Sequence, residues 1–183
     1  AAVEVLEATV EAMPDYKGIL YGQFMLTNEG PKVIEYNARF GDPEAMNTLP
    51  VLETPFLDVL TAARDGEDLP ELEFSGEATV CKYAVPEGYP TDPDSGAKIE
   101  VNEETVGAGL LFYASVDERD DGLYTTTSRS VAVVGLADSI DAAESVADDA
   151  LATAGDGLRI RHDIGKADLV QQRVDHMAEL RDD

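Results

Sequence analysis

The sequence predicts an α+β fold, and three observations lead to this prediction. First, helices and strands do not alternate: a helix, a hairpin and two short helices come first, several strands follow, and two helices come last. Second, strand-forming residues lie in short runs bounded by Gly, Pro, Asn and Asp, as in antiparallel sheets. Third, residues 67–75 are acidic, contain Pro70 and carry little periodicity. We therefore expect two domains, residues 1–75 and 76–183, the second being a small, mainly antiparallel sheet with helices.

The first domain is predicted to begin with an amphipathic helix that ends before Pro14. Apolar residues recur there at helical spacing: Val3, Leu6, Val10 and Met13. Residues 19–26 and 32–37 are rich in strand formers, and the turn-like residues 27–31 connect them. These segments predict a β-hairpin with a five-residue loop.

Two short helices are predicted after the hairpin. Asp42 before Pro43, and Thr54 before Pro55, have the usual order of an N-cap and a first helical residue. Gly66 is suited to end the second of these helices, because glycine adopts the left-handed backbone of a helix C-terminus.

The second domain is predicted to be mostly strands. Its strand-like segments are residues 78–85, 98–101, 109–116, 123–127 and 130–137. A helix is predicted over residues 139–154, with Asp138 or Ser139 as its N-cap and Gly155 as its stop. A last helix is predicted over residues 167–180.

The composition indicates a folded and strongly acidic protein. Hydrophobic residues make up 44% of the chain, and 13 Lys and Arg against 38 Asp and Glu give a net charge of −25. A protein this acidic is not expected to bind nucleic acid or an anionic membrane, and we interpret the charge as a salt-adapted surface. Cys81 is the single cysteine, which favours the cytoplasm. The chain begins with Ala1 inside a predicted helix, so we expect it to be part of a longer protein.

The predicted hairpin brings a set of polar side chains onto one face. A symmetric five-residue loop pairs Gln23 with Glu35 and Tyr21 with Asn37. Side chains alternate across a strand, so Glu35, Asn37 and Arg39 are expected on the same face, joined by Gln23. The opposite, apolar layer is expected to take two residues, Ile34 and Tyr36.

This face has the chemistry of a metal and phosphate site. Mg²⁺ prefers oxygen ligands, and Glu35, Asn37 and Gln23 offer one carboxylate and two amide oxygens. Arg39 offers a planar fork of donors suited to phosphate, so the set is suited to phosphoryl transfer. The alternative is an ordinary solvent-facing strand. The prediction also depends on loop length, because a slip of one residue would move Gln23 to the other face from Glu35.

A longer string resembles a known family. Residues 18–47 read GILYGQFMLTNEGPKVIEYNARFGDPEAMN and resemble the ATP-grasp C-terminal lobe of phosphoribosylamine–glycine ligases, also called glycinamide ribonucleotide synthetases, of purine synthesis. E-x-N-x-R is shared by many ATP-grasp enzymes, whereas R-F-G-D-P-E is much more specific to this family, and G-Q-F-M-L looks like its archaeal form. Residues 78–90 and the R-H-D-I-G motif at residues 161–165 resemble the family's C-terminal domain, which is of the biotin-carboxylase C-terminal type.

The resemblance implies roles for individual residues. It implies Mg²⁺ or Mn²⁺ on Glu35 and Asn37, with Gln23 as a third ligand, and Arg39 on the transferring phosphate and the acyl phosphate. Asp42 is a candidate to hold a substrate amine, although it is equally well explained as an N-cap. The other residues of the specific loop beside this site are Gly41 and Glu44.

The implied reaction has two steps. ATP phosphorylates the carboxylate of glycine, and the amine of 5-phosphoribosylamine then attacks the acyl phosphate, giving glycinamide ribonucleotide, ADP and phosphate. The family's N-terminal part, with its nucleotide-clamping lysines, has no counterpart in this sequence. We therefore expect these 183 residues alone to bind metal–nucleotide weakly and to turn over nothing.

Two alternative functions remain open at this point. One is another ATP-grasp enzyme, such as a purine-pathway or biotin-dependent carboxylase, which R-F-G-D-P-E speaks against. The other is a non-catalytic binding module with an ATP-grasp half-fold, which the presence of Glu35, Asn37 and Arg39 speaks against.

The remaining polar residues are given structural interpretations. His162 and His176 are interpreted as surface or packing residues, and Cys81 as a partly buried, inert thiol. The pair Asp148–Asp149 is interpreted as a solvated helix face. Three residues near the end of the chain are candidates to hold the second domain against the first through paired charges: Arg159, Arg161 and Asp163.

Overall fold

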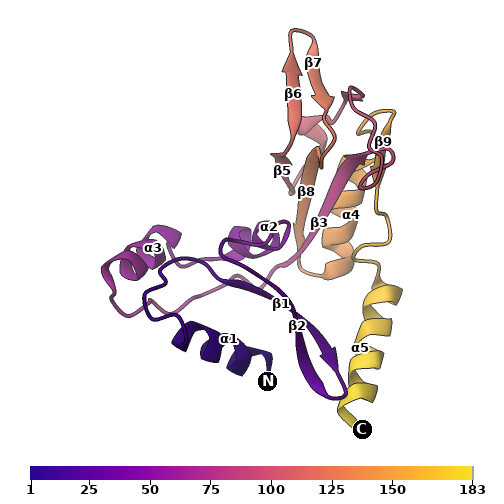
Figure 1. The fold of residues 1–183 in the computed structure, drawn as a ribbon. Helices are drawn as coiled ribbons and strands as arrows, with labels where there is room; N and C mark the ends of the chain where they lie inside the picture. The colour runs from indigo at the N-terminus through magenta and orange to yellow at the C-terminus, as the bar shows by residue number, and fades with distance from the viewer. Residues whose placement is uncertain (183) are drawn as a thin grey trace. The chain divides into compact units, whose positions relative to one another are not determined.

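The computed structural model describes residues 1–182, and these form two compact units. The first contains residues Ala1–Ser75 and the C-terminal segment from Gln172, and the second contains Gly76–Gln171. The predicted α+β class is confirmed, because the described residues form antiparallel sheets and helices (Figure 1). The predicted division into residues 1–75 and 76–183 stays a prediction, and the structure groups the segment from Gln172 with the first unit.

The elements of the first unit are α1 (Ala2–Glu11), β1 (Tyr21–Thr27), β2 (Gly30–Asn37), α2 (Glu44–Thr48), the 3-10 helix η1 (Leu49–Val51) and α3 (Phe56–Asp65). The elements that follow are β3 (Ala78–Pro86), β4 (Lys98–Ile99), the 3-10 helix η2 (Glu103–Thr105), β5 (Leu110–Tyr113), β6 (Val116–Arg119), β7 (Gly122–Thr125), β8 (Val131–Ala137), α4 (Ile140–Leu151), β9 (Leu158–Ile160) and α5 (Ala167–Asp182). Within residues 1–182, no helix combines the length and apolarity that a membrane span needs.

The hairpin of β1 and β2 has a shorter turn than predicted. Thr27 pairs with Gly30, so the turn has two central residues rather than a five-residue loop, and Leu26 pairs with Pro31 rather than Lys32. Gly30 has a φ of 96°, a left-handed backbone that glycine adopts without strain. The hydroxyl of Thr27 accepts a hydrogen bond from the Glu29 N–H at 3.2 Å, which stabilises the tight turn.

A β-bulge corrects the register farther along the hairpin. Phe24 pairs with Val33 but Gln23 pairs with Glu35, so Ile34 is the extra residue on β2. The predicted pairings of Gln23 with Glu35 and Tyr21 with Asn37 are therefore confirmed, although the predicted loop was wrong. Ile34 does not enter the predicted apolar layer, because the bulge removes it from the strand alternation and leaves it 54% exposed.

Helix α1 packs on the face of the hairpin opposite Glu35. A Cβ atom on Gly22 would lie 2.8 Å from the side chain of Leu6, so the helix approaches the strand closely there. Thr9 and Tyr36 join their hydroxyls at 2.9 Å. Tyr36 also packs edge-to-face on Phe24 with 6.3 Å between ring centroids, so Tyr36 does enter the apolar layer.

The two helices after the hairpin start one residue later than predicted. Helix α2 begins at Glu44 with Pro43 as its N-cap, and α3 begins at Phe56 with Pro55 as its N-cap. Neither N-cap gives a side-chain hydrogen bond, so Asp42 is not the predicted cap of α2. Gly66 ends α3 in the left-handed conformation, as predicted.

The second unit is built on a four-stranded antiparallel sheet in the order β5-β8-β3-β9. Helix α4 packs against β3 and β8 (Figure 1). A Cβ atom on Gly135 would lie 1.9 Å from the carbonyl oxygen of Ala143, so glycine allows helix and strand to touch. The core between them is apolar: Ala84, Ile99, Val106, Val131, Val133, Ala147, Ala150, Leu151 and Ala154.

Three predictions for the second unit needed correction. The predicted strand over residues 109–116 is two strands, β5 and β6, which belong to different sheets. Strand β6 joins β4 and β7 in a three-stranded sheet, and β9 was not predicted at all. Helix α4 has Ser139 as its N-cap, accepting from the Ala142 N–H at 3.3 Å, but it ends at Leu151 rather than residue 154.

Candidate functional site

The hairpin register gathers three of the predicted ligands. Gln23 lies opposite Glu35, and Asn37 is two residues farther along β2 on the same face. Glu35 and Gln23 are exposed, and Asn37 is half-buried. The amide nitrogen of Asn37 donates to Glu35 Oε1 at 2.8 Å. This bond engages the amide nitrogen of Asn37 and one of the two carboxylate oxygens of Glu35.

The guanidinium of Arg39 makes a hydrogen bond within the loop that follows the hairpin. Strand β2 ends at Asn37, so Arg39 lies in the following loop rather than on the strand face that was predicted. Its Nη1 donates to the carbonyl oxygen of Phe40 at 2.7 Å. Phe40 in turn packs on Phe56 of α3 with 5.7 Å between ring centroids, which anchors the start of the loop.

Glu44 joins this region from the far end of the same loop. The Tyr21 hydroxyl donates to Glu44 Oε1 at 3.1 Å, and Tyr21 is the residue paired with Asn37. Burial raises the pKa of the Tyr21 hydroxyl, and the hydrogen bond and charge of Glu44, followed by the charge of Glu35, raise it further. Two carboxylates therefore act on one phenol. Sequence reasoning gave Glu44 no role, although the predicted pairing of Tyr21 with Asn37 already placed the phenol where this loop begins.

Asp42 lies on the exposed side of the loop. Its contact with a substrate amine stays a prediction. Among residues 1–182, no group of three or more His, Cys, Asp or Glu side chains is arranged to hold a metal ion. The predicted metal ligands are of another composition, one carboxylate and two amides.

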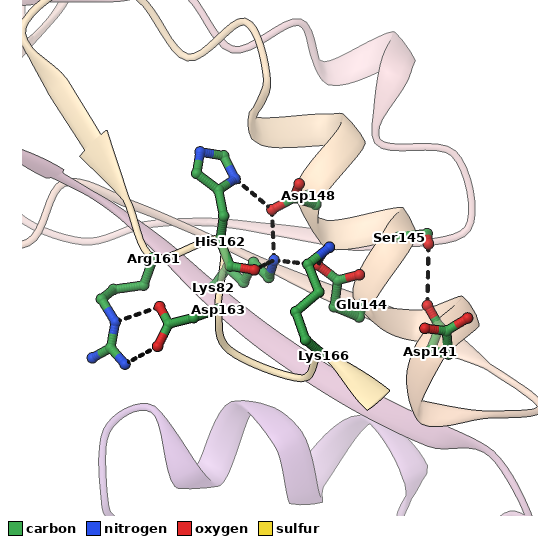
Figure 2. Close-up of polar contacts among 9 residues, drawn as sticks. All are labelled: Lys82, Asp141, Glu144, Ser145, Asp148, Arg161, His162, Asp163 and Lys166. Atoms are coloured by element: carbon green, nitrogen blue, oxygen red, sulfur yellow. Dashed lines mark hydrogen bonds and ion pairs between the residues drawn. The ribbon is translucent and has the colours of Figure 1, made fainter. Parts of the chain in front are cut away.

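A second polar cluster, which the sequence did not reveal, lies in the second unit around Lys82 (Figure 2). Lys82 is fully buried, and its Nζ lies 2.5 Å from Glu144 Oε1 and 2.5 Å from Asp148 Oδ1. Lys166 reaches Glu144 at 2.7 Å, and His162 Nδ1 lies 2.8 Å from Asp148. We call these five residues the Lys82 cluster. It joins β3, α4 and the segment before α5.

The electrostatics of the Lys82 cluster favour its charged carboxylates. Burial by itself raises the pKa of Glu144, but hydrogen bonds and charges from Lys166 and Lys82 outweigh it and hold that pKa below its ordinary value. Burial also opposes ionisation of Asp148, and Lys82 and His162 lower its pKa in the same way. The interpretation of Asp148 as a solvated helix face was therefore wrong, because the side chain turns toward a buried ammonium group.

The other residues singled out in the second unit make local contacts. Arg161 and Asp163 pair with each other at the surface, which lowers the pKa of Asp163 to about 2. Arg159 donates to the carbonyl oxygen of Tyr89 at 3.0 Å. Cys81 is buried, 6% exposed, and forms no disulfide. His162 is a surface residue, as predicted, with its ring against Asp148.

Comparison with known families identifies both parts of the chain. Residues 1–45 match the family model described as phosphoribosylglycinamide synthetase, ATP-grasp (A) domain, and residues 79–167 match the C domain of the same synthetase. The chain belongs to the phosphoribosylglycinamide synthetase family. The family predicted from R-F-G-D-P-E is therefore confirmed.

Curated relatives agree with this assignment. The chain is 52% identical over 185 residues to the phosphoribosylamine–glycine ligase of Methanococcoides burtonii, covering 98% of this chain and 42% of the relative. It is 51% identical over 188 residues to that of Methanocaldococcus jannaschii, with the same coverage of both chains. The chain thus spans less than half the length of the curated relatives it matches.

Solved structures agree as well. The crystal structure of phosphoribosylamine–glycine ligase from Thermotoga maritima matches with a TM-score of 0.67 and 29% identity, over 79% of this chain and 36% of that one. N5-carboxyaminoimidazole ribonucleotide synthetase from Thermotoga maritima matches with a TM-score of 0.55 and 20% identity, which shows likeness of fold alone.

The family match divides the two polar regions between two domains. The part of the synthetase A domain that is matched contains α1, the hairpin and the loop as far as Ala45. The part matched to the synthetase C domain contains the whole Lys82 cluster, because all five residues lie within residues 79–167. The predicted ligands and the Tyr21–Glu44 contact therefore belong to the ATP-grasp part of the chain.

Proposed function

We propose that the full-length protein containing this chain ligates glycine to 5-phosphoribosylamine, as a step of purine biosynthesis. The products are glycinamide ribonucleotide, ADP and phosphate, and glycyl phosphate is the intermediate. One observation carries the proposal: a chain of the phosphoribosylglycinamide synthetase family retains Glu35 and Asn37 on one strand face, with Gln23 opposite Glu35.

Glu35, Asn37 and Gln23 are the proposed ligands of Mg²⁺ or Mn²⁺. The fit is chemical: all three offer oxygen atoms, and the Asn37–Glu35 hydrogen bond engages the amide nitrogen of Asn37 and only one carboxylate oxygen of Glu35. A bound Mg²⁺ or Mn²⁺ would neutralise negative charge on the phosphoryl oxygens of ATP. A set of one carboxylate and two amides suits a cation that shares its coordination with nucleotide phosphates.

Arg39 and Asp42 are proposed to handle the substrates. Arg39 carries a positive guanidinium that can pair with the transferring phosphate, which requires its side chain to turn from the Phe40 carbonyl. Asp42 is exposed in the same loop and is proposed to hold a substrate amine. In a phosphoryl transfer, such residues contribute by positioning and by compensating charge rather than by covalent chemistry.

The rest of the same enzyme is the proposed partner of the first unit. Val59 and Ala62 are the only hydrophobic residues of its described part that are buried. Large hydrophobic side chains on α1 and the hairpin are exposed: Val3, Val10, Met25, Leu26, Val33 and Ile34. Such a surface is unusual for a unit that is complete, and it suits burial against the preceding part of the longer protein.

The test is glycine-dependent formation of ADP by the full-length protein, with the variant Glu35→Ala. We expect activity to fall more than about hundredfold, because changes next to a metal ligand already cause losses of 10- to 100-fold. Glu29→Ala is the matched control, since Glu29 lies in the same hairpin, paired with Lys32 at 3.0 Å and away from the ligand face.

Two outcomes would contradict the proposal, and a third would contradict a separate expectation for the 183 residues alone. ADP formation that depends on bicarbonate rather than glycine would favour a carboxylase. Equal activity of Glu35→Ala and Glu29→Ala would remove the metal role. Turnover by the 183 residues alone would contradict our expectation that this part binds metal–nucleotide weakly and is inactive by itself.

We also propose a setting for the enzyme. The net charge of −25 supports a salt-adapted protein, because salt screens repulsion between like surface charges. The single cysteine and the small-molecule substrates of the proposed reaction support residence in the cytoplasm.

A further inference from the structure

One hydrogen bond closes the loop that follows the ligand face. Tyr21 is the first residue of β1, and Glu44 is the first residue of α2. The Tyr21 hydroxyl donates to Glu44 Oε1 at 3.1 Å, so the bond joins the strand end to the helix start across residues 38–43. Tyr21 is also paired with Asn37, so the same residue contacts the ligand strand and the end of the loop.

The backbone of the loop is shaped to permit this contact. Gly41 is buried, and a Cβ atom there would lie 2.5 Å from Glu44 Oε2 and 3.2 Å from the Glu44 Cβ. The N–H of Ala45 donates to the Gly41 carbonyl oxygen at 3.0 Å, which holds the turn closed. A side chain at position 41 would crowd the Glu44 side chain, so glycine there leaves room for Glu44 to reach Tyr21.

The phenol of Tyr21 has one O–H to donate, and it donates this hydrogen to Glu44 Oε1. An ionised carboxylate only accepts hydrogen bonds, so the contact has a single direction. The position of the Glu44 carboxylate relative to the Glu35–Asn37 face is thus set by Tyr21.

We propose that Tyr21 is a positioning residue that, through Glu44, holds the Arg39–Glu44 loop beside the Glu35–Asn37 face to receive the amino-acid acceptor. This inference rests on the proposed function. Phosphoryl transfer requires the attacking oxygen to lie in line with the transferred phosphoryl group. The loop flanks the face proposed for the metal and phosphates. If the loop moves, the position of the attacking glycine carboxylate therefore changes more than the position of the nucleotide.

The test compares four variants of the full-length protein: Tyr21→Phe, Glu44→Ala, their double variant and the control Tyr16→Phe. Tyr16 lies in the same unit and its hydroxyl donates to the carbonyl oxygen of Ile19 at 2.8 Å, away from the loop. We expect Tyr21→Phe to lower kcat/KM for glycine about tenfold, equivalent to about 1.4 kcal/mol. The KM for ATP should change by less than about twofold, and Tyr16→Phe should match wild type, if the loop serves the acceptor.

The double variant tests whether both residues act through one contact. If they do, its loss in kcat/KM for glycine equals that of Glu44→Ala alone, because two residues in one contact are not additive. Additive losses in the double variant would overturn the inference. An unchanged kcat/KM for glycine in Tyr21→Phe would also overturn it, as would binding of glycine and ATP weakened to the same extent. A wild-type protein without glycine-dependent ADP formation would instead refute the proposed function, so the two failures are distinguishable.

Discussion

Replacing Lys82 by methionine removes the ammonium group but keeps a long apolar side chain in the strand. Glu144, whose side chain is 3% exposed, then loses one of its two lysine partners, and Asp148, 26% exposed, keeps only His162. Breaking a buried ion pair by removing one partner costs about 3–5 kcal/mol. Lys166 remains 2.7 Å from Glu144 and water can reach Asp148, so we expect the lower end, about 3 kcal/mol.

The assay is amide hydrogen exchange of β3 and α4 in the full-length protein. A loss of about 3 kcal/mol raises the opening equilibrium, and hence the exchange rate of the slowest amides, by roughly 150-fold. Lys98→Met is the matched control, because Lys98 is exposed and lies 3.7 Å from Asp121. An exposed pair contributes little, so the control should change exchange by less than about twofold.

The double variant Lys82→Met/Glu144→Met separates charge from packing. It removes the uncompensated buried carboxylate, and apolar replacement of a buried pair is often neutral, so exchange should return to within about tenfold of wild type. Two results would refute the reasoning. One is a Lys82→Met variant within about threefold of wild type, and the other is a double variant that exchanges as fast as the single one.

Further predictions concern α4 and the surface. Gly135→Ala puts a Cβ atom 1.9 Å from the Ala143 carbonyl oxygen, so α4 must move; we expect a loss of about 3 kcal/mol in the same exchange assay. Gly76→Ala, with nothing within 4 Å, is its control and should be nearly silent. Glu144 and Asp148 have lowered pKa values, so their stabilisation is full above the ordinary values of 4.5 and 3.8 and is lost as pH falls through the lowered ones. Exchange of α4, corrected for intrinsic rates, should therefore accelerate in that acid range, and constant protection would contradict it. The thermal midpoint should rise between about 0.1 and about 2 M KCl as surface repulsion is screened; a fall would speak against salt adaptation.

Local patterns allowed much of the fold to be predicted. The runs that became β3 and β8 are rich in strand formers, and Ser139 before an apolar-periodic segment marks the start of α4. Strand β9 was missed because three residues give no periodicity. The ends of β5 and β6 were missed because the chain changes sheet without a glycine or proline to mark it.

The candidate site could be predicted from the chemistry of its side chains, but the positions of residues outside the strands could not. Glu35, Asn37 and Gln23 share a face because strand alternation and pairing determine it. Arg39 lies beyond the end of β2 at Asn37, where strand alternation no longer determines the face that a side chain takes. The Tyr21–Glu44 contact depends on how a loop folds back, which no periodicity encodes.

The Lys82 cluster was missed for a different reason. Its partners are separated in sequence by 62 and 66 residues, so no local pattern joins them. A lysine in the middle of the apolar run of β3 was the one available signal. Such a residue needs a buried counter-charge, which only the packing of α4 on the sheet supplies.

The bulge at Ile34 separates the two ends of the hairpin from each other. Because Ile34 is not paired, the strand pairing near the turn is offset by one residue from the pairing at Gln23 and Glu35. A natural insertion or deletion of one residue at the turn can be absorbed at the bulge, with Gln23 still facing Glu35. The hairpin tip can therefore change in length by one residue while the spacing of the proposed oxygen ligands is preserved.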